Sequence, residues 1–317
     1  MTKYKINHIT KYTYPGSITE SMNHIMLFPF EDNYQEVRKH ELIISTHPVV
    51  ETFNDYFGNK VGIFSIAKSI DELVIQSRLE VTLLPSEIPA DATLPAIQWT
   101  ELANIKNQFP FIDFLFQEKY DAADELKETV HDLLDLTKTP FNIAQKMSEF
   151  VFSHFEYKKG ITDIETKVQD IWKLKAGVCQ DFAHILLSML RMSGIPARYV
   201  SGYICPKNHE MRGEGATHAW VEAYIPFAGW VGLDPTNNCL TSDRHIRLAI
   251  GRHFNDCTPV KGTYKGSAGH KLEVAVNIES EFSKNAATLE PVFSYQSHQP
   301  EIKDNSYRKF LEMQQQQ

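Results

Sequence analysis

The chain has 317 residues, enough for two ordinary domains, and its content of 42% hydrophobic and 23% charged residues is typical of a soluble globular protein. The formal net charge is −8, and no run of Lys or Arg stands out, which argues against nucleic acid as a partner.

We expect neither a signal peptide nor a membrane span. The N-terminus lacks the apolar core and the small-residue cleavage site of a secretory signal. The most apolar stretch, 183–195, contains Arg191 and is too short to cross a bilayer. The four cysteines are far apart and form no CxxC pair, which favours free thiols. The sequence therefore predicts a cytoplasmic protein that does not bind membranes.

The first part of the chain contains alternating segments rich in β-forming residues. These segments are 3–14, 38–46, 60–68 and 72–84. Turn signals such as NDYFGN (54–59) separate them. We expect an antiparallel β-rich N-terminal domain over residues 1–88, and the segment 86–95 with its prolines is expected to be a boundary.

From about residue 121 the apolar residues recur at helical spacing. The pattern predicts helices over 122–136, 141–155 and 180–193. Gly194 followed by Pro196 is a stop signal for the last of these. Strand-like runs follow at 197–204, 217–225, 230–234 and 271–279.

Helices followed by strands predict an α+β catalytic core over residues 96–281. The remaining segment, 282–317, is polar, lacks periodicity and ends in four glutamines. We expect it to be a loosely ordered tail.

Cys179 stands in the first turn of the helix predicted over 180–193, close behind Gly177. The positive end of a helix dipole and its unpaired N–H groups stabilise a thiolate and can bind an oxyanion. Asp181, in the same turn, also suits the dipole. A free cysteine is often a small buried hydrophobic residue, so this segment alone leaves both interpretations open.

His218 begins one predicted strand and Asp234 ends the next. A turn that pairs Ile225 with Gly229 would put both side chains on one face, where Asp234 can hold the Nδ1–H of His218. A register shifted by one residue would put them on opposite faces. Each residue alone also fits a structural role, His218 as a strand histidine and Asp234 as a turn former before proline.

Together Cys179, His218 and Asp234 form a complete acyl-transfer set of nucleophile, base and orienting carboxylate. Their joint occurrence favours catalysis over the separate structural roles.

Three aromatic residues are further candidates for an oxyanion site or acyl pocket. Tyr157 and Trp172 can each donate a hydrogen bond to an oxyanion. Trp220 can form a wall of the acyl pocket, although core packing explains all three residues as well. Three charged or titratable residues could face the cleft but fit surface or ion-pair roles better, namely Arg244, His245 and Arg252.

Other chemistries lack their motifs. The sequence has no HExxH, P-loop or G-x-S-x-G elbow, no pair of histidines at convincing ligand spacing and no calcium loop. We therefore expect no metal and no required cofactor.

Around the triad the sequence resembles the bacterial transglutaminase-like proteins, often described as predicted cysteine proteases. The resemblance rests on segments 177–203, 217–238 and 242–266, and on the β-rich N-terminal stretch. It spans about residues 3–280. It implies an α+β fold with a papain- and transglutaminase-like core behind an antiparallel β-rich domain, and catalytic roles for Cys179, His218 and Asp234.

The leading hypothesis is thiol-dependent hydrolysis of a peptide or isopeptide amide in a protein or peptide substrate, through a thioester. Protein-glutamine transamidation, in which a lysine amine replaces water, shares the same acylation step. A non-catalytic protein-binding module is the alternative from a different class, and an intact triad argues against it.

Overall fold

The computed structural model describes residues 1–84, 91–117, 123–162, 166–205, 211–213, 216–266, 269–280 and 293–296. Part of the expected boundary at 86–95 and most of the expected tail at 282–317 lie outside these residues. Within the tail, strand β16 (Phe293–Gln296) pairs with a neighbouring strand.

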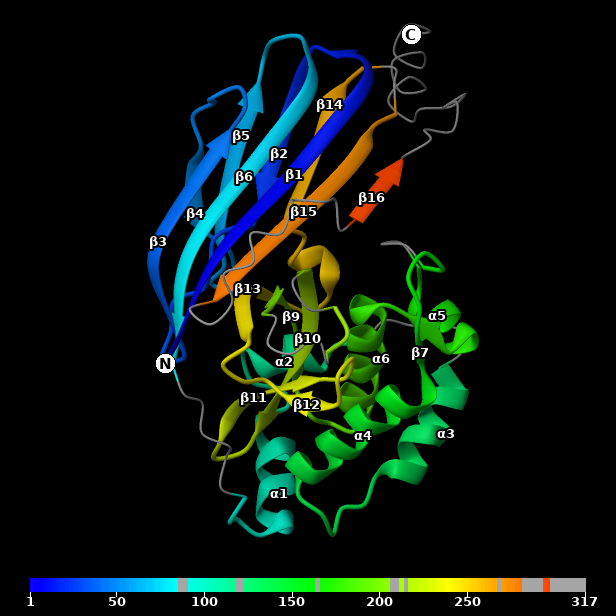
Figure 1. The fold of residues 1–317 in the computed structure, drawn as a ribbon. Helices are drawn as coiled ribbons and strands as arrows, with labels where there is room; N and C mark the ends of the chain where they lie inside the picture. Colours follow the sequence, from blue (N-terminus) through cyan, green and yellow to red (C-terminus); the bar gives the residue numbers. More distant parts are fainter. Residues whose placement is uncertain are drawn as a thin grey trace, which may run out of the picture.

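Two antiparallel sheets form the upper part of the molecule in Figure 1. Their strands are β1 (Thr2–Ile18), β2 (Glu20–Ile25), β3 (Gln35–Ile44), β4 (Glu51–Asn54), β5 (Lys60–Ile66), β6 (Ile70–Leu83), β14 (Val260–Lys265), β15 (Lys271–Ser280) and β16. One sheet has the order β16-β15-β1-β6-β3 and the other β14-β2-β5-β4. Alternate residues of β1, such as Tyr4, Ile6 and His8, are buried because successive side chains point to opposite faces of a strand. The four strands expected from alternation are confirmed.

The end of the expected catalytic core returns to these sheets. Strand β15 lies beside β1, with Tyr4 opposite Ser280, and β14 lies beside β2. The structure thus places residues 260–280 with the N-terminal strands, whereas the expected division assigned them to the segment 96–281. These pairings join strands more than 230 positions apart, which local sequence patterns do not reveal.

The lower part combines helices with a third sheet. Its helices are α1 (Pro95–Ile105), α2 (Phe111–Leu115), α3 (Ala123–Leu133), α4 (Pro140–His154), α5 (Val168–Leu174) and α6 (Cys179–Met192), with a 3₁₀ turn η1 (Phe254–Asp256). Its strands are β7 (Glu156–Tyr157), β8 (Ala176–Gly177), β9 (Ala197–Ile204), β10 (Ala216–Ile225), β11 (Gly229–Asp234), β12 (Cys239–Leu240) and β13 (His245–Gly251). None of the helices in the described residues is long and apolar enough to cross a membrane.

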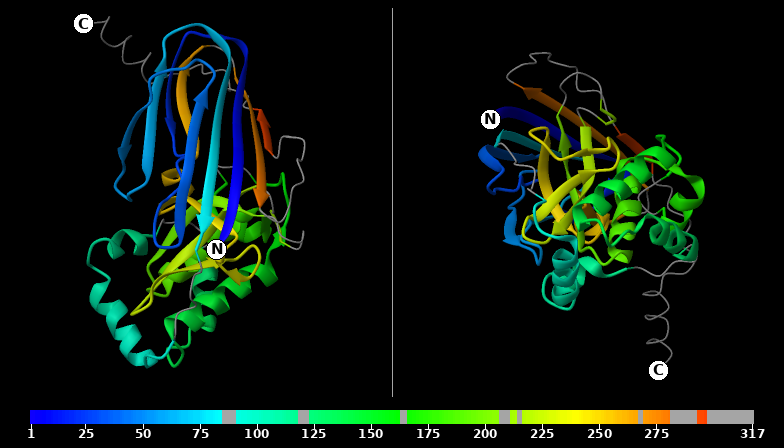
Figure 2. Two further views of the ribbon diagram at one scale, coloured as in Figure 1. Left: turned by 60° about the vertical axis from the view of Figure 1, so that its left-hand side comes forward. Right: turned by 90° about the horizontal axis from the view of Figure 1, so that it is seen from below.

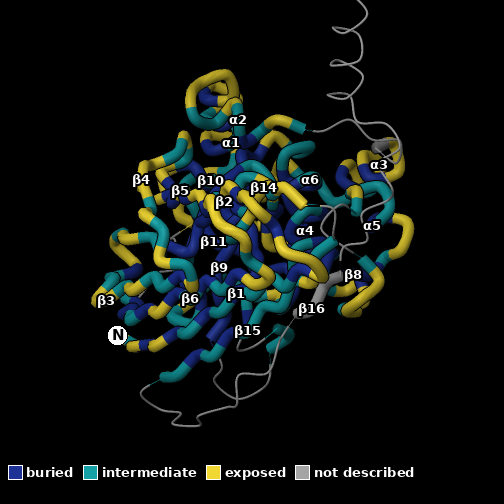
Figure 3. Tube along the Cα trace, turned by 90° about the horizontal axis from the view of Figure 1, so that it is seen from above, coloured by how far each residue is buried: buried dark blue, intermediate teal, exposed yellow. Residues whose placement is uncertain are grey.

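The sheet of order β12-β11-β10-β9-β13 positions the site. Helix α6 packs against β9 and β10, and α4 packs against α6. Figure 2 (right) shows these helices together beside the sheet. In Figure 3 the buried residues run through β9, β10 and β11, whereas β4 is exposed. The ends of α6, β10 and β11 are thereby fixed by a densely packed core.

Two amide side chains of the N-terminal region hold the edge strand β13. Asn59 donates from Nδ2 to the Ile250 carbonyl (2.7 Å) and accepts from the Ile250 N–H (2.8 Å). Gln35 makes the same pair of contacts with the backbone of Arg247, at 2.9 and 2.8 Å. Both amides are almost completely buried, so they replace the neighbouring strand that β13 lacks on this side.

Replacing Asn59 with alanine is expected to lower the free energy of unfolding by roughly 2–4 kcal/mol, because two buried backbone groups of Ile250 lose their partners. Urea unfolding measures the effect, and Asn104→Ala, at an exposed position, is the matched control. Equal stability of the two variants would contradict the assigned role of Asn59.

Candidate active site

The nucleophile candidate Cys179 is the first residue of α6, which confirms its expected position at a helix start. The N–H of Val178 donates to Oδ2 of Asp181 (2.7 Å), and the Thr162 hydroxyl donates to the same oxygen (2.7 Å). A Cβ at Gly177 would overlap the Asp181 carboxylate, so glycine is required there. This local network holds the first turn of α6 and its thiol in place.

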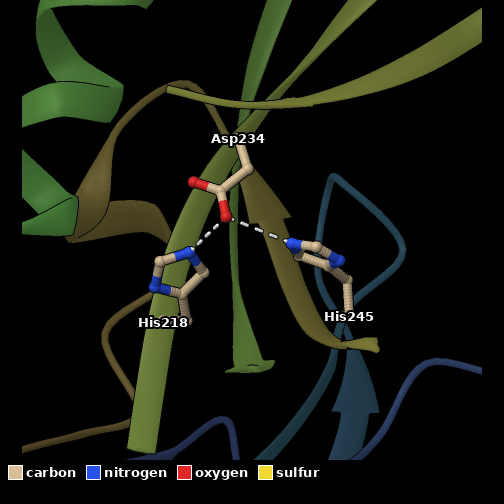
Figure 4. Close-up of side chains that lie close together, drawn as sticks. All are labelled: His218, Asp234 and His245. Carbon is tan, nitrogen blue, oxygen red and sulfur yellow. Dashed lines mark hydrogen bonds and ion pairs between the residues drawn. The ribbon is translucent and has the colours of Figure 1, made fainter. Parts of the chain in front are cut away.

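His218 and Asp234 lie on one face of neighbouring strands, as Figure 4 shows. Strands β10 and β11 pair Ile225 with Gly229, which confirms the expected register. The expected contact through Nδ1 is wrong, since Nε2 of His218 lies 2.9 Å from Oδ2 of Asp234. The carboxylate contacts Nε2 of the imidazole, so Nδ1 is not engaged by Asp234.

The Cys179 side chain acts on His218. Burial alone lowers the pKa of His218, but the charge and hydrogen bond of Asp234, together with those of Cys179, outweigh burial and raise the pKa to about 10. Nδ1 of His218 is buried and makes no hydrogen bond of normal geometry within the described residues. Asp234 and Cys179 therefore both favour the protonated form of His218.

The Asp234 carboxylate is completely buried and accepts several hydrogen bonds. Besides His218, Oδ2 accepts from Nδ2 of Asn237 (2.8 Å) and lies 3.2 Å from Nε2 of His245, while Oδ1 accepts from the N–H of Thr236 (2.9 Å). Burial alone raises the pKa of Asp234, but the two histidines outweigh it and hold the pKa of this carboxyl well below its usual range. Asp234 is thus a fixed negative charge behind the imidazole.

His245 is a second imidazole beside Asp234, so its expected surface role is wrong. The N–H of Ser242 donates to Nδ1 of His245 (3.3 Å), which leaves the proton on Nε2, where it points at Asp234. Burial lowers the pKa of His245. The charges are therefore divided, with His218 as the imidazolium and His245 as a neutral donor. For Arg252, which pairs with Asp256, the ion-pair role is confirmed.

Two of the three aromatic candidates are adjacent to the histidines or to the thiol. The ring of Trp220 stacks on His218 with centroids 6.3 Å apart and meets His245 edge-on at 5.3 Å. Trp220 is buried, so it supports the histidines from behind. Trp172 packs in the core against Phe155, and no hydrogen bond or ring contact within the described residues joins it to Cys179 or His218.

Tyr157 is half-buried and lies close to His218. It pairs with Gly177, two residues before Cys179, in the short parallel sheet β7-β8. A Cβ at Gly213 would lie 3.4 Å from Nδ1 of His218 and 3.7 Å from the Tyr157 hydroxyl. Burial and the nearby Cys179 raise the pKa of Tyr157 to about 12, so at neutral pH its O–H can donate to an oxyanion.

The atoms of His218, Asp234 and His245 that could bind a metal lie within 4.8 Å of one another. Both histidines already hydrogen-bond to Oδ2 of Asp234, and Asn237 donates to the same oxygen. They form a hydrogen-bonded network, and the absence of a required metal stays a prediction.

Comparison with known proteins identifies the family. Residues 127–235 match the transglutaminase-like superfamily, and residues 4–82 match the bacterial transglutaminase-like N-terminal region. An uncharacterized protein of Mycobacterium leprae is 31% identical over 283 residues, which cover 88% of this chain and 99% of that protein. The chain belongs to the transglutaminase-like superfamily.

A solved structure shows the same fold. The transglutaminase-like chain matches a Cytophaga hutchinsonii protein described as a "Putative Cysteine Protease", with a TM-score of 0.72, 20% identity and coverage of 92% of this chain and 93% of that one. The expected fold class is thereby confirmed. A protein-glutamine gamma-glutamyltransferase of Pseudomonas aeruginosa is 32% identical over 101 residues, 30% of this chain and 15% of that protein.

In this transglutaminase-like protein we expect the imidazolium of His218 to lose its proton near pH 10, as against about 6.5 for an ordinary histidine. Because the folded pKa is raised, the protonated ring stabilises the fold fully below pH 6.5, and this contribution is lost as the pH rises through about 10. NMR titration of ¹⁵N-labelled imidazoles measures the pKa of His218, and the variant His218→Gln assigns its signal. A midpoint at or below 6.5 would contradict the coupling of His218 to Asp234 and Cys179.

Proposed function

We propose that this protein is a cysteine-dependent enzyme that hydrolyses peptide or isopeptide amide bonds through a thioester. The observation that supports the proposal most directly is the setting of His218, a buried imidazole whose Nε2 contacts Asp234 and whose pKa is raised by Asp234 and by Cys179. This is the order in which a proton is relayed in thiol acyl transfer.

The reaction has two halves. The Cys179 thiolate attacks the amide carbonyl, and the His218 imidazolium gives its Nδ1 proton to the leaving amine as the C–N bond breaks. The acyl group is then a thioester on Cys179. Neutral His218 takes a proton from water, the resulting hydroxide attacks the thioester, and the acid leaves as the thiolate and imidazolium are restored.

Two groups of donors support an oxyanion in both halves. The backbone N–H groups of Cys179 and Gln180 come before the first hydrogen bonds to the Val178 carbonyl, which Asp181 and Phe182 make, and they lie at the positive end of the helix dipole. The Tyr157 hydroxyl lies near Nδ1 of His218 and has no hydrogen bond within the described residues. We propose that these groups stabilise the tetrahedral intermediate.

Transamidation is the second candidate. It is favoured by the similarity of about a third of the chain to the Pseudomonas aeruginosa protein-glutamine gamma-glutamyltransferase. The acylation step is the same, but a lysine amine replaces water in the second half.

Mass spectrometry of the intact protein after mixing with a pool of peptides tests both candidates. Hydrolysis predicts an acyl adduct that hydroxylamine removes, together with new peptide termini. Transamidation predicts that an added primary amine is incorporated into the product. The absence of an adduct, of cleavage and of amine incorporation would leave the protein as a binding module and would overturn the proposal.

A further inference from the structure

Arg212 is held beside the catalytic residues by Asn237. Oδ1 of Asn237 accepts from the N–H of Arg212 (2.7 Å), and its Nδ2 donates to the Arg212 carbonyl (3.3 Å) and to Asp234 (2.8 Å). The next residue, Gly213, lies against Nδ1 of His218. One amide therefore fixes both the catalytic carboxylate and the backbone that carries Arg212.

The Arg212 guanidinium is oriented, and within the described part of the chain it has no counter-ion. It lies over the ring of Phe152, 4.5 Å from the centroid, and makes one long contact with the Thr236 carbonyl (3.5 Å). The residue is half-buried, and no carboxylate of the described residues pairs with it. Other arginines have such partners. Arg198 and Arg247 bind Glu222, for example, and Arg252 binds Asp256. As far as the described residues go, most of the Arg212 donors are therefore available to a ligand.

The charge of the Arg212 guanidinium acts on Tyr157, beside the proposed catalytic residues. A Cβ at Gly213, the residue after Arg212, would lie 3.7 Å from the Tyr157 hydroxyl, and the charges of both Cys179 and Arg212 act on this hydroxyl. A substrate whose amide carbonyl reaches the thiol thus places its neighbouring groups beside Arg212.

We propose that Arg212 binds a carboxylate of the substrate, so that the preferred substrate carries an acidic group next to the amide that Cys179 attacks. The inference rests on the proposed function and names its substrate class. Guanidinium and carboxylate form charge-assisted hydrogen bonds, and a cation held in advance by Phe152 and Asn237 loses little freedom on binding. The carboxylate can belong to an Asp or Glu side chain or to a peptide C-terminus.

Two alkylating reagents of nearly equal size test the proposal. Iodoacetate carries a carboxylate and iodoacetamide does not, and both attack the same thiolate. The ratio of their rate constants at Cys179 therefore cancels any change in the thiolate population. We expect Arg212→Gln to lower the iodoacetate-to-iodoacetamide ratio roughly fivefold and Arg212→Lys to retain most of it, since a lysine keeps the charge.

Arg252→Gln, which removes an arginine with its own carboxylate partner, is the matched control and should leave the ratio unchanged. An unchanged ratio in Arg212→Gln, including an equal fall of both rate constants, would overturn the proposal and reduce Arg212 to a positioning residue. Failure of both reagents to label Cys179 in the unaltered protein would instead overturn the proposed function, and this inference with it.

Three synthetic peptide pools separate the sources of the carboxylate. One pool contains internal Asp and Glu with amidated ends, one contains a free C-terminus on neutral peptides, and one is neutral throughout. Faster cleavage of one charged pool, lost in Arg212→Gln, identifies the source. Equal cleavage of all three pools would contradict the inference.

Discussion

Replacing Cys179 with alanine is expected to lower turnover roughly 10⁴-fold or more, because no other group can form the acyl intermediate. Cys179→Ser nearly keeps the volume of the side chain, but its hydroxyl is a far weaker acid, so His218 does not hold it as an anion and turnover should stay low. Steady-state cleavage of the peptides found by mass spectrometry measures both effects.

The other cysteines supply the control for this prediction. Burial raises the pKa of Cys239 to about 12 and raises the pKa of Cys205 and Cys257 well above the usual range for a thiol. Iodoacetamide at pH 7 should therefore label Cys179 and spare these three. Cys239→Ala should keep normal turnover. Strong labelling elsewhere, or activity that survives in Cys179→Ala, would reject Cys179 as the nucleophile.

Replacing Asp234 with asparagine is expected to lower turnover roughly 10³–10⁴-fold. Donors approach both carboxylate oxygens, three at Oδ2 and one at Oδ1. Whichever way an asparagine amide turns, its NH₂ group meets at least one of these donors. The variant also loses the negative charge that raises the pKa of His218, so the imidazolium should lose its proton at lower pH.

The pH profile of turnover separates this effect from simple loss of folding. The alkaline limb should move to lower pH in Asp234→Asn, and the NMR titration of His218 should move with it. Asp135→Asn, which alters an exposed carboxylate, is the control and should change neither. A folded Asp234→Asn variant with turnover within about threefold of the normal value would show that Asp234 does not orient the imidazole.

Local patterns in the sequence predicted much of the fold. Helices α3, α4 and α6 and strands β9, β10 and β11 follow from apolar spacing and from stop signals near Gly194, because each segment buries one continuous face. Helices α1, α2 and α5 gave no comparable signal in the sequence. The return of β14 and β15 to the N-terminal sheets was also missed, since such pairing depends on contacts across most of the chain.

The site divides in the same way. The structure brings Cys179, His218 and Asp234 together from three segments that each carried a local signal. His245 carried no such signal. It follows Asp234 by only 11 positions, but it lies on the edge strand β13, and the sheet order places β10 and β9 between this strand and β11. A Cβ at Gly202 would lie 2.7 Å from Cη2 of Trp220, so this glycine of β9 makes room for the aromatic ring behind the histidines.

Asn237 and Arg212 were missed for a different reason. Asn237 follows Asp234 in a turn, where asparagine is common for local backbone reasons. Arg212 precedes His218 in a polar segment with no periodic pattern. Only the contacts of the Asn237 side chain with both elements show that the turn and the segment act together.

The buried amides of Gln35 and Asn59 also bear on how this protein can be divided. They satisfy backbone groups on the outer side of β13, the strand that carries His245. A catalytic half produced without its partner would expose that row of N–H and C=O groups, a template onto which another chain can add a strand. The N-terminal strands thus protect the edge of β13 from pairing with another copy of the chain, and the two halves need each other to remain monomeric.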